Sequence, residues 1–568
     1  MDLSPEVGLN KQSINYKSFE SPQLAHGSKP DVNKVQKEVP LHQLASGCFL
    51  DDVSANKTKE SSSNNAPKYV YIACIIFAVV VTFATMLQVY LGENMLFVEG
   101  MLVSDHERCT AVGQRVLRDR GSSVDAAIAA VLCLGVVHPH VIGIGGGGVM
   151  LVHNTRKNET KVLNFQGVAP KGLKEEMLQS GFRKKAGLLV GVPGMLRGLH
   201  QAHRLYGSLS WQNVAARAAV VAREGFNVSQ SLASAISNVK GDSLMGRFRA
   251  TFFPDGRALR PGSFLRMPSV ARLLQVGLSN FYSGNLSQEM EEEVRAQGGV
   301  LSREDISNYI VDVGQPLEGL YKKFRILVPA HPSAAAALLL TAKLLEGFNK
   351  TDRNQTVLRW TSKALKEAVR MGISEYNSSM TELLSDMLRK GSVDMLRPEI
   401  WHSLGSPPED QSRVHTIQKT ALMAGQVEVM GPDGLMVSMA GSLSRPFGSR
   451  ILTRSGIILN SLILEFYQTN KAGKNQGIKI QPDKRPALSA LTPTIVVPAW
   501  RVCGTYMALS LSLAGLVERP DGTIVQSLFP EDRVQTLNES AQRVERLRTV
   551  VHGVLRNQDV MQEMYVFS

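Results

Sequence analysis

The sequence has little cysteine and no concentrated block of basic residues. Five cysteines occur in 568 residues, and the 63 Lys and Arg residues are spread along the chain despite a formal charge of +13. His138 and His140 share one loop, but no Cys, Asp or Glu is spaced to complete a metal site with them. We therefore expect no metal and no nucleic-acid partner, and interpret the charge as a mildly basic surface.

Residues 1–68 lack any sustained apolar periodicity. They are rich in Ser, Asn, Lys, Gln and Pro, as in "KTKESSSNNAPK". A segment of this composition cannot bury enough apolar surface to order itself. We expect a disordered cytoplasmic tail over 1–68.

Residues 69–91 lack charge altogether. The run "YVYIACIIFAVVVTFATMLQVYL" is 23 residues long, enough to cross about 30 Å of hydrocarbon as a helix. It lies too far from residue 1, and is too long, for a cleaved signal peptide. Lysines precede it and acidic residues follow it: Lys57, Lys59 and Lys68 before, and Glu93, Glu99 and Asp105 after. The positive-inside rule then predicts a signal anchor with a cytosolic N-terminus, hence a single-pass type II membrane protein with a lumenal or extracellular body.

Two further features agree with a lumenal body. Asn-x-Ser/Thr triplets, the acceptors of N-glycosylation, occur seven times after the span, at Asn158, Asn227, Asn285, Asn349, Asn354, Asn377 and Asn538. Three cysteines also lie beyond the span, Cys109, Cys133 and Cys503, where oxidising conditions allow a disulfide. Three thiols cannot all pair, so one stays free or reaches another chain.

A glycine run from Gly145 to Gly148 follows Gly143 in "HPHVIGIGGGGVMLV" and matches G-x-G-x-x-G. A dinucleotide site needs a strand before the glycines and a helix after them. Here the order is reversed, with a helix predicted over 122–137 and a strand over 149–154, and no acidic residue follows at the required distance. We therefore expect no cofactor, and glycines that serve close backbone packing or a positive φ.

Local patterns predict helix-rich flanks around central antiparallel strands. Ser122 is placed to cap the helix over 122–137, with Asp125 in its first turn. Further helices are expected within 104–121, 187–207, 210–226, 267–299, 331–348 and 540–556, and strands within 324–330, 456–466 and 491–499. Alternation on both sides of Gly431–Gly434 predicts a β-hairpin. These elements favour a layered α+β fold of the αββα kind.

Several stretches resemble the γ-glutamyltransferases, also called glutathione hydrolases. The longest is "CTAVGQRVLRDRGSSVDAAIAAVLCLGVVHPHVIGIGGGG", and "VGVPGMLRG", "FYSGNLS", "AQGGVLSREDISNY", "GSLSRPFGS" and "GIILNS" follow in the family's order. The resemblance implies a four-layer αββα Ntn-hydrolase sandwich. It also implies a large-subunit-like region over 92–423 and a small-subunit-like region over 424–568, truncated at its C-terminus, with a disulfide between Cys109 and Cys133.

The chemistry implied by the family is cleavage of the γ-glutamyl bond of glutathione and its conjugates, or transfer of the γ-glutamyl group to acceptors. The precursor cuts itself, and the new N-terminal Thr attacks the γ-glutamyl amide with its own α-amine as base. Backbone N–H groups of a Gly-Gly pair stabilise the oxyanion.

The nucleophile of the family is missing from this sequence. Counting back without gaps from Asp433-Gly434 places the nucleophile position at Ala424 and the family histidine at Gln426. Alanine has no hydroxyl, so it can neither attack a γ-glutamyl bond nor cut the chain. Thr420 could act only if four residues were inserted before the hairpin.

The substrate-binding positions are also altered. The arginine that holds the substrate carboxylate falls at Gln166, which cannot form a charged bidentate pair. The other pocket positions fall at Leu464 and Glu465, Ser444, Ser442, Ser489-Ala490 and Cys503-Gly504. We carry over Ser442, Glu465, Ser489 and Gly504 as substrate-binding remnants. The favoured hypothesis is a catalytically silent glycoprotein, a pseudoenzyme of the family, and the alternative is an active glutathione hydrolase that uses Thr420 on glutathione or γ-glutamyl compounds.

Overall fold

The computed structural model describes most of the chain between residues 100 and 330 and much of its C-terminal quarter. The described ranges are 66–92, 100–178, 182–239, 246–275, 278–321, 324–330, 339, 424–466, 485–486, 491–499, 506–511, 516–518, 524–526, 551–557 and 560–566. The chain divides into two units, Met1–Gln88 and Val89–Ser568.

The uncharged segment forms a helix, α1, over Ala66–Gly92. This helix includes all of the span predicted over 69–91 and begins three residues before it. Its described apolar side chains, among them Ile72 and Phe77, are exposed. Over the residues that the structure describes, no helix meets the length and hydropathy needed for crossing a membrane. The tail predicted over 1–68 lies outside the described residues up to position 65.

The first of two six-stranded sheets is fully antiparallel and holds the β-hairpin. Its strand order is β1 (Met101–Ser104), β9 (Gly425–Met430), β10 (Leu435–Ser442), β2 (Gly147–Asn154), β3 (Glu159–Asn164) and β6 (Asp312–Gly314). The hairpin predicted around Gly431–Gly434 is confirmed as β9 and β10. It lies between β1 and β2, so the region after 424 completes a sheet that begins near residue 101.

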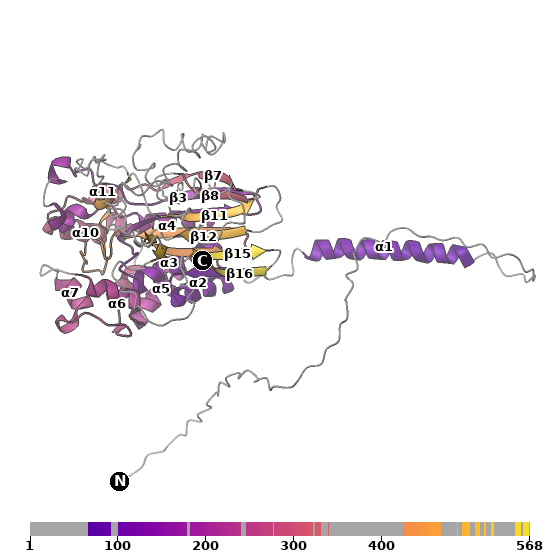
Figure 1. Cartoon of the computed structure of the whole chain (residues 1–568), viewed down its shortest axis with the longest axis horizontal. Helices are drawn as coiled ribbons and strands as arrows, with labels where there is room; N and C mark the ends of the chain where they lie inside the picture. The colour runs from indigo at the N-terminus through magenta and orange to yellow at the C-terminus, as the bar shows by residue number, and fades with distance from the viewer. Residues whose placement is uncertain are drawn as a thin grey trace, which may run out of the picture. The chain divides into compact units, whose positions relative to one another are not determined.

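The second sheet stacks on the first (Figure 1). Its order is β16 (Val560–Val566), β15 (Val551–Asn557), β12 (Tyr506–Leu511), β11 (Pro493–Pro498), β8 (Phe324–Pro329) and β7 (Pro316–Tyr321). Apolar side chains of both sheets form one buried cluster, with Val149 and Leu151 from the first sheet against Ile495 and Val497 from the second. This cluster is what holds the two sheets face to face.

The prediction of a helix over 540–556 is wrong for residues 551–556, which belong to β15. The segment after Val551 pairs with β12 on one side and β16 on the other. Pairing with two neighbouring strands overrides the local helical pattern, because strand preference depends mainly on the tertiary context.

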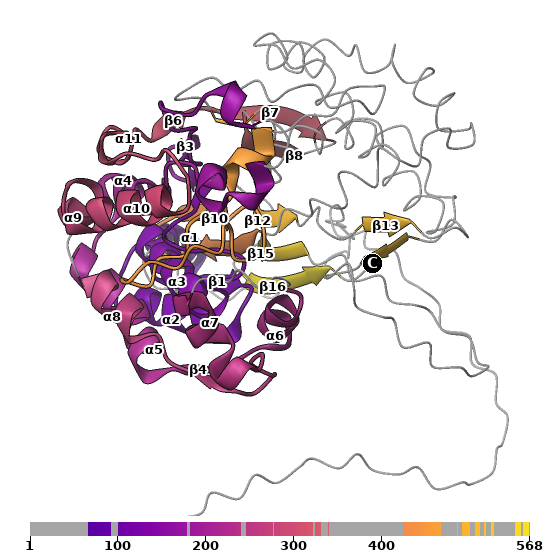
Figure 2. The ribbon, with the colours of Figure 1, turned by 90° about the vertical axis from the view of Figure 1, so that its left-hand side faces the viewer.

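Helices cover the outer face of the first sheet (Figure 2). The layer is built from α2 (Glu107–Arg118), α3 (Ser123–Val137), α4 (Met195–Tyr206) and α5 (Trp211–Glu224). Helix α3 is buried on every side apart from Gly135, as its continuous apolar run predicts. Its capping box between Ser122 and Asp125 is also confirmed.

The structure also describes further elements outside this layer. The helices are α6 (Gln230–Ser237), α7 (Gly246–Phe252), α8 (Pro268–Gln275), α9 (Leu278–Ser283), α10 (Asn285–Ala296) and α11 (Arg303–Ser307). The 3-10 turns are η1 (Glu175–Leu178), η2 (Phe182–Lys184), η3 (Ala186–Leu189), η4 (Pro254–Gly256) and η5 (Leu462–Phe466). The two-stranded pairs are β4 (Phe226–Asn227) with β5 (Phe264–Leu265) and β13 (Leu516–Glu518) with β14 (Ile524–Gln526). The mixed α/β architecture is as expected. The helix predicted over 331–348 lies outside the described residues except for Leu339.

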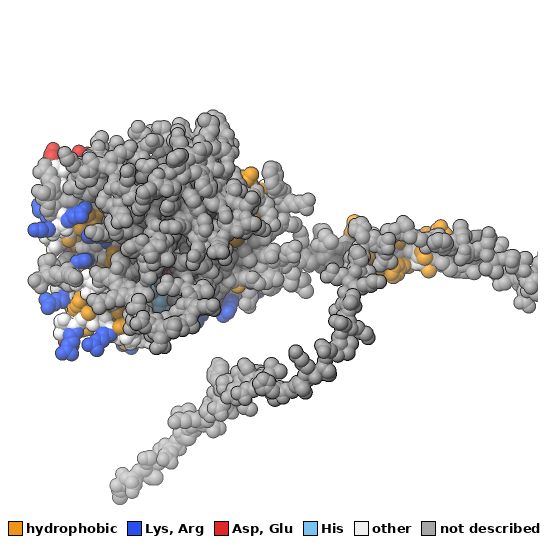
Figure 3. Space-filling view, viewed as in Figure 1, with side chains coloured by type: hydrophobic (Ala, Val, Ile, Leu, Met, Phe, Trp, Pro, Cys, Tyr) orange, Lys and Arg blue, Asp and Glu red, His pale blue; other side chains and the backbone are white. Residues whose placement is uncertain are grey.

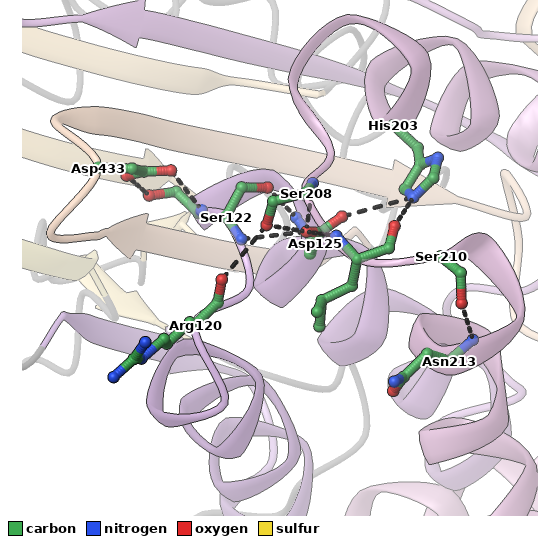
Figure 4. Close-up of polar contacts among 10 residues, drawn as sticks. Arg120, Ser122, Asp125, His203, Ser208, Ser210, Asn213 and Asp433 are labelled. Carbon is green, nitrogen blue, oxygen red and sulfur yellow. Dashed lines mark hydrogen bonds and ion pairs between the residues drawn. The ribbon is translucent and has the colours of Figure 1, made fainter.

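Two aspartates tie the start of α3 to its surroundings (Figure 4). Asp125 Oδ2 accepts hydrogen bonds from the backbone N–H groups of Ser122, Ser208 and Leu209, at 3.0, 2.8 and 3.0 Å. Asp433, in the turn between β9 and β10, accepts from the Ser123 N–H at 2.8 Å and from its hydroxyl at 2.6 Å. The hairpin is therefore anchored to the N-terminus of the central helix, where a carboxylate is favoured.

A disulfide joins α2 to α3. Cys109 and Cys133 are bonded, with their Cα atoms 5.4 Å apart, which is the pairing implied by the resemblance. Both are fully buried. The cross-link closes a loop of 24 residues and holds the two helices that pack beside the first sheet.

Candidate functional site

The beginning of β9 is fixed by continuous pairing with β10. Strand β9 pairs with β10 from Gly425 opposite Gly441 to Met430 opposite Met436, and with β1 from Val427 to Met430. Every residue from 425 to 430 therefore occupies one position of an uninterrupted ladder. Ala424 directly precedes it, so the gapless count back from Asp433 places Ala424 at the N-terminal end of the strand. Thr420 lies outside the described residues.

Alternate residues of β9 face the space between the two sheets, as strand geometry requires. Ala424 packs against the apolar cluster there. Gln426 is 2% exposed, and its Nε2 has no hydrogen-bond partner among the described residues. Its backbone N–H donates to Asp105 Oδ2 at 2.8 Å. The two positions that the gapless count assigns to the family nucleophile and histidine thus hold a methyl group and an amide.

Glu428 follows on the same face of β9 and is fully buried. Burial raises the pKa of its carboxyl well above the usual value; the Ser438 hydroxyl lowers that pKa and the nearby Asp105 raises it. Burial therefore favours the protonated form of this carboxyl.

The glycine run lies on the other side of β10 from this strand and packs against the loop that follows β10. Asn460, 3% exposed, links the two: its Nδ2 donates to the Gly145 carbonyl at 2.8 Å and to the Gly191 carbonyl at 2.9 Å. A Cβ on Gly145 would overlap the Ile458 carbonyl oxygen, and one on Gly146 would overlap the Ser442 carbonyl oxygen. The glycines are there because other chain segments touch their backbone, as expected from the sequence.

The segment 456–466, predicted as a strand, is instead a loop followed by η5. Only single bridges form in it, Gly145 with Leu459 and Leu452 with Ile458. Asn460 Oδ1 accepts from the N–H groups of Gly191 and Leu462, at 2.9 and 3.0 Å, which turns the chain into η5. A side-chain amide that bonds the backbone in this way competes with strand pairing.

The loop after β10 contains strained backbone. Ser444, Phe447 and Arg450 have φ of 74°, 59° and 64°, in the left-handed region that non-glycine residues rarely adopt. Phe447 is fully buried against Phe248 and Phe252, with ring centroids 5.2 and 4.9 Å away. Packing therefore holds the strained conformation, and strain of this kind concentrates at functional sites.

Three of the predicted pocket positions meet at this loop. Ser442 Oγ accepts from the Ser444 N–H at 2.9 Å, and the Ser444 hydroxyl bonds to the carboxyl of Glu465 in η5. Burial raises the pKa of Glu465 to about 7, while the Ser444 hydroxyl lowers it. Leu464, the other position of the family acidic pair, packs with an apolar cluster. Ser489, Cys503 and Gly504 lie outside the described residues.

The position of the carboxylate-binding arginine is occupied by a buried amide. Gln166 is 3% exposed, and its Oε1 finds no hydrogen-bond partner in the described part of the chain. Its carbonyl accepts from the Tyr309 hydroxyl at 2.7 Å. Arg485, which sequence reasoning did not single out, donates to the carbonyls of Asn164 and Ile310, both at 3.2 Å. Gln166 itself supplies no charge for a substrate carboxylate.

Three histidines lie close to the disulfide-linked helices. The rings of His106 and His138 are 5.2 Å apart and those of His138 and His140 5.4 Å apart. Burial, together with the neighbouring His106, lowers the pKa of His138 to about 3. Within the described ranges, no group of three or more His, Cys, Asp or Glu side chains is arranged to hold a metal ion. The histidines are neutral packing groups.

Comparison with known proteins gives the relationship of the whole chain. Residues 109–507 match the model of the gamma-glutamyltranspeptidase family. The chain belongs to this family. It is 43% identical over 488 residues to a Homo sapiens protein named Glutathione hydrolase 7, covering 82% of this chain and 73% of that protein. It is 28% identical over 438 residues to Arabidopsis thaliana Glutathione hydrolase 2, covering 72% and 74%.

Among solved structures, the γ-glutamyltranspeptidase-family chain resembles cephalosporin acylase from Bacillus halodurans. The TM-score is 0.59 at 24% identity, over 70% of this chain and 75% of the acylase. At 24% identity, the resemblance between this chain and the acylase concerns the fold alone. It agrees with the Ntn-hydrolase type of architecture implied by the sequence.

Proposed function

We propose that the chain is a catalytically silent member of the γ-glutamyltranspeptidase family that keeps the fold to bind a ligand or a partner. The observation that carries this proposal is the register of β9 against β10, which runs without interruption from Gly425 and so supports the gapless count that assigns the family threonine position to Ala424. Loss of a nucleophile typically lowers turnover by about 10⁶-fold. In the family, the threonine nucleophile also performs the self-cleavage. The proposal therefore includes a chain that stays uncut.

The rest of the pocket supports the same proposal. Gln166 replaces the charged clamp on the substrate carboxylate, and a hydrogen bond to a charged group contributes about 1.5–3 kcal/mol. Gln426 carries no charge, and burial raises the pKa of the neighbouring Glu428 carboxyl well above its usual value. Ser442, Ser444 and Glu465 remain together as a polar cluster.

The proposal also includes membrane anchoring and glycosylation. The uncharged run over 69–91, with lysines before it and acidic residues after it, supports a type II anchor. The acceptor asparagines in the described ranges, Asn158, Asn227 and Asn285, are exposed, as glycan attachment requires. Glycosidase treatment of the expressed protein should reduce its apparent mass, and protease added to intact cells should remove the epitopes that follow the anchor.

A second candidate function is an active glutathione hydrolase that uses Thr420. The name of the human relative at 43% identity favours it. Purified full-length protein distinguishes the two candidates. A catalytically silent protein should give one uncut chain and should release no chromophore from a chromogenic γ-glutamyl substrate. A new N-terminus at Thr420, with turnover that Thr420→Ala abolishes, would establish the second candidate instead.

A further inference from the structure

The strand pair β4–β5 carries an aromatic side chain at the surface. Phe264 is 58% exposed, and of the exposed large apolar side chains that the structure describes after α1 it is the only aromatic one. An aromatic side chain has about 150–250 Å² of surface, so on the order of 100 Å² of this ring contacts water. Covering part of this area would stabilise the folded protein.

Two neighbours hold the Phe264 ring in place. Gly225 lies against the tip of the ring, and a Cβ there would come within 2.6 Å of Phe264 Cζ. Its φ of 95° also requires glycine at this position. The Arg266 guanidinium lies over the ring, 5.3 Å from its centroid, and Arg266 Nε donates to the Glu224 carbonyl at 3.2 Å. Phe264 is therefore a fixed apolar platform, which loses little conformational entropy when another group covers it.

A glycan acceptor lies directly opposite this ring. Strands β4 and β5 pair with Asn227 opposite Phe264 and with Phe226 opposite Leu265. Side chains paired across antiparallel strands lie on one face, with their Cβ atoms about 4.5–5.5 Å apart. Phe226 and Leu265 are buried, whereas Asn227 and Phe264 are both exposed and share the outer face. A sugar attached to Asn227 Nδ2 would therefore begin within reach of the ring.

The Asn227 side chain makes no hydrogen bond to any residue that the structure describes. Asn158 differs, because its Oδ1 accepts from Arg325 at 2.7 Å. The third residue of the Asn227 triplet, Ser229, caps α6, and its hydroxyl accepts from the Leu232 N–H at 3.2 Å. The acceptor amide is therefore available at a fixed position beside the ring.

The surface around this pair suits a sugar better than a protein partner. Among the described side chains visible in Figure 3, apolar ones on the side that carries α6 and α7 occur in small groups between basic and polar ones. Protein interfaces need a broader apolar area than this. One fixed ring matches the apolar face of a single sugar, whose C–H groups are attracted to the negative face of an aromatic ring.

We propose that the first N-acetylglucosamine of a glycan on Asn227 packs on the Phe264 ring and stabilises the β4–β5 pair. The inference rests on the proposed glycosylation and gives one of its acceptor sites a structural role. Strand β4 joins α5 to α6, and β5 leads into α8. The Met267 N–H, just before α8, donates to the Ala222 carbonyl of α5 at 2.9 Å. Loss of the glycan should therefore loosen the junction of these three helices.

The test uses full-length protein in detergent, produced in a host that adds N-glycans. Mass spectrometry measures the occupancy of Asn227. Hydrogen exchange follows the β4–β5 segment, including the Val228 and Gly262 amides, which donate to the carbonyls of Ser263 and Val228, both at 2.8 Å. Enzymatic removal of the whole glycan should speed this exchange about 5- to 10-fold, the effect of returning about 50 Å² of apolar surface to water. Trimming the glycan to its first N-acetylglucosamine should leave the exchange unchanged, because that sugar alone covers the ring.

Substitutions separate the contact from its two partners. Asn227→Gln should speed the exchange by the same factor as removal of the glycan. Phe264→Ala should speed it at least as much, and adding Asn227→Gln to it should have no further effect, because the contact is already lost. Phe264→Tyr keeps the ring and should keep the protection. Asn285→Gln is the matched control: it removes a proposed glycan at the start of α10, where Phe281 and Tyr282 are buried, and it should leave the β4–β5 exchange unchanged.

Unchanged exchange after complete removal of the glycan overturns the inference. So does an Asn227→Gln effect that persists in full beside Phe264→Ala, or an Asn227 that carries no glycan. If Phe264→Ala does not fold, the two enzymatic treatments of the wild-type protein decide. The same preparation is analysed for chain cutting and γ-glutamyl turnover. Cut, active protein contradicts catalytic silence without affecting the glycan contact, whereas a silent protein whose β4–β5 exchange ignores the glycan does the reverse.

Discussion

The glycine run and the beginning of β9 lie on either side of β10 in one sheet, and they differ in what surrounds them. At Gly145 and Gly146 the backbone is in contact with other chain segments, and there is no room for a side chain. At Ala424 and Gln426 the backbone ladder is equally regular, but the side chains carry no nucleophile and no base. One region carries the fold of the γ-glutamyltranspeptidase family, and the other carries its chemistry.

The difference teaches that the fold of a family and its catalytic side chains can be lost separately. Side chains at the end of a strand can change without disturbing the ladder, because the hydrogen bonds that fix the strand are made by the backbone. A close backbone contact tolerates no such change, since any Cβ would displace another segment. The most recognisable motif of an enzyme family therefore reports the fold and does not by itself report activity.

The largest effect is expected from Gly145→Ala. The added methyl group overlaps the Ile458 carbonyl oxygen, so the loop must move and the hydrogen bonds of Asn460 are lost. We expect destabilisation of about 4 kcal/mol or more, measured by urea unfolding or as loss of soluble expression. Gly143→Ala is the control in the same run, because a Cβ there has no neighbour within 4 Å. It should change stability by less than about 1 kcal/mol, and equal effects of the two substitutions would contradict the packing role.

Phe447→Ala should have the next largest effect. The ring is fully buried against Phe248, Phe252 and His140, and its removal leaves a cavity. We expect a loss of about 3–4 kcal/mol by chemical denaturation. Phe447→Leu fills most of the cavity and should cost about 1 kcal/mol. A small effect of Phe447→Ala would mean that this side chain does not hold the strained loop.

Glu465→Gln should remove part of the pH dependence of stability. The folded-state pKa of Glu465 is raised to about 7 from 4.5, so the folded protein takes up a proton in this interval. The stabilisation that the protonated carboxyl gives is complete below pH 4.5 and is lost as the pH rises through about 7, by about 3 kcal/mol. The measurement is the difference in unfolding free energy between wild type and variant at pH 5 and pH 8. A difference that does not depend on pH contradicts the burial of this carboxyl.

Substitutions at Ala424 should have the smallest effect. Ala424→Ser adds one oxygen at a partly buried strand end, and stability should change by about 0.5 kcal/mol or less. Ala424→Thr should leave the chain uncut and inactive, because Gln426 and Gln166 remain. Turnover gained by Ala424→Thr alone would show that the rest of the catalytic machinery is intact.

The parts of the fold that could be predicted are those fixed by local patterns. Ser122 and Asp125 cap α3 as expected, and the turn at Gly431–Gly434 joins two strands. The errors lie where distant contacts decide the structure. Asn460 turns the expected strand over 456–466 into a loop through bonds to Gly145 and Gly191, which lie far away in the sequence.

The candidate site was predictable only where it coincides with family motifs. Ser442, Ser444 and Glu465 meet in the structure, and the resemblance placed them in one pocket. Arg485 was not predictable, because its hydrogen bonds to the carbonyls of Asn164 and Ile310 join segments that lie far apart in the sequence.

The central claim is that a family fold is maintained here without its nucleophile. The most direct test is the intact mass and N-terminal sequence of the deglycosylated full-length protein, measured together with γ-glutamyl turnover on the same sample. The account predicts one uninterrupted chain and no turnover above background. Two chains cut within 420–424, with turnover that depends on the new N-terminal residue, would contradict it.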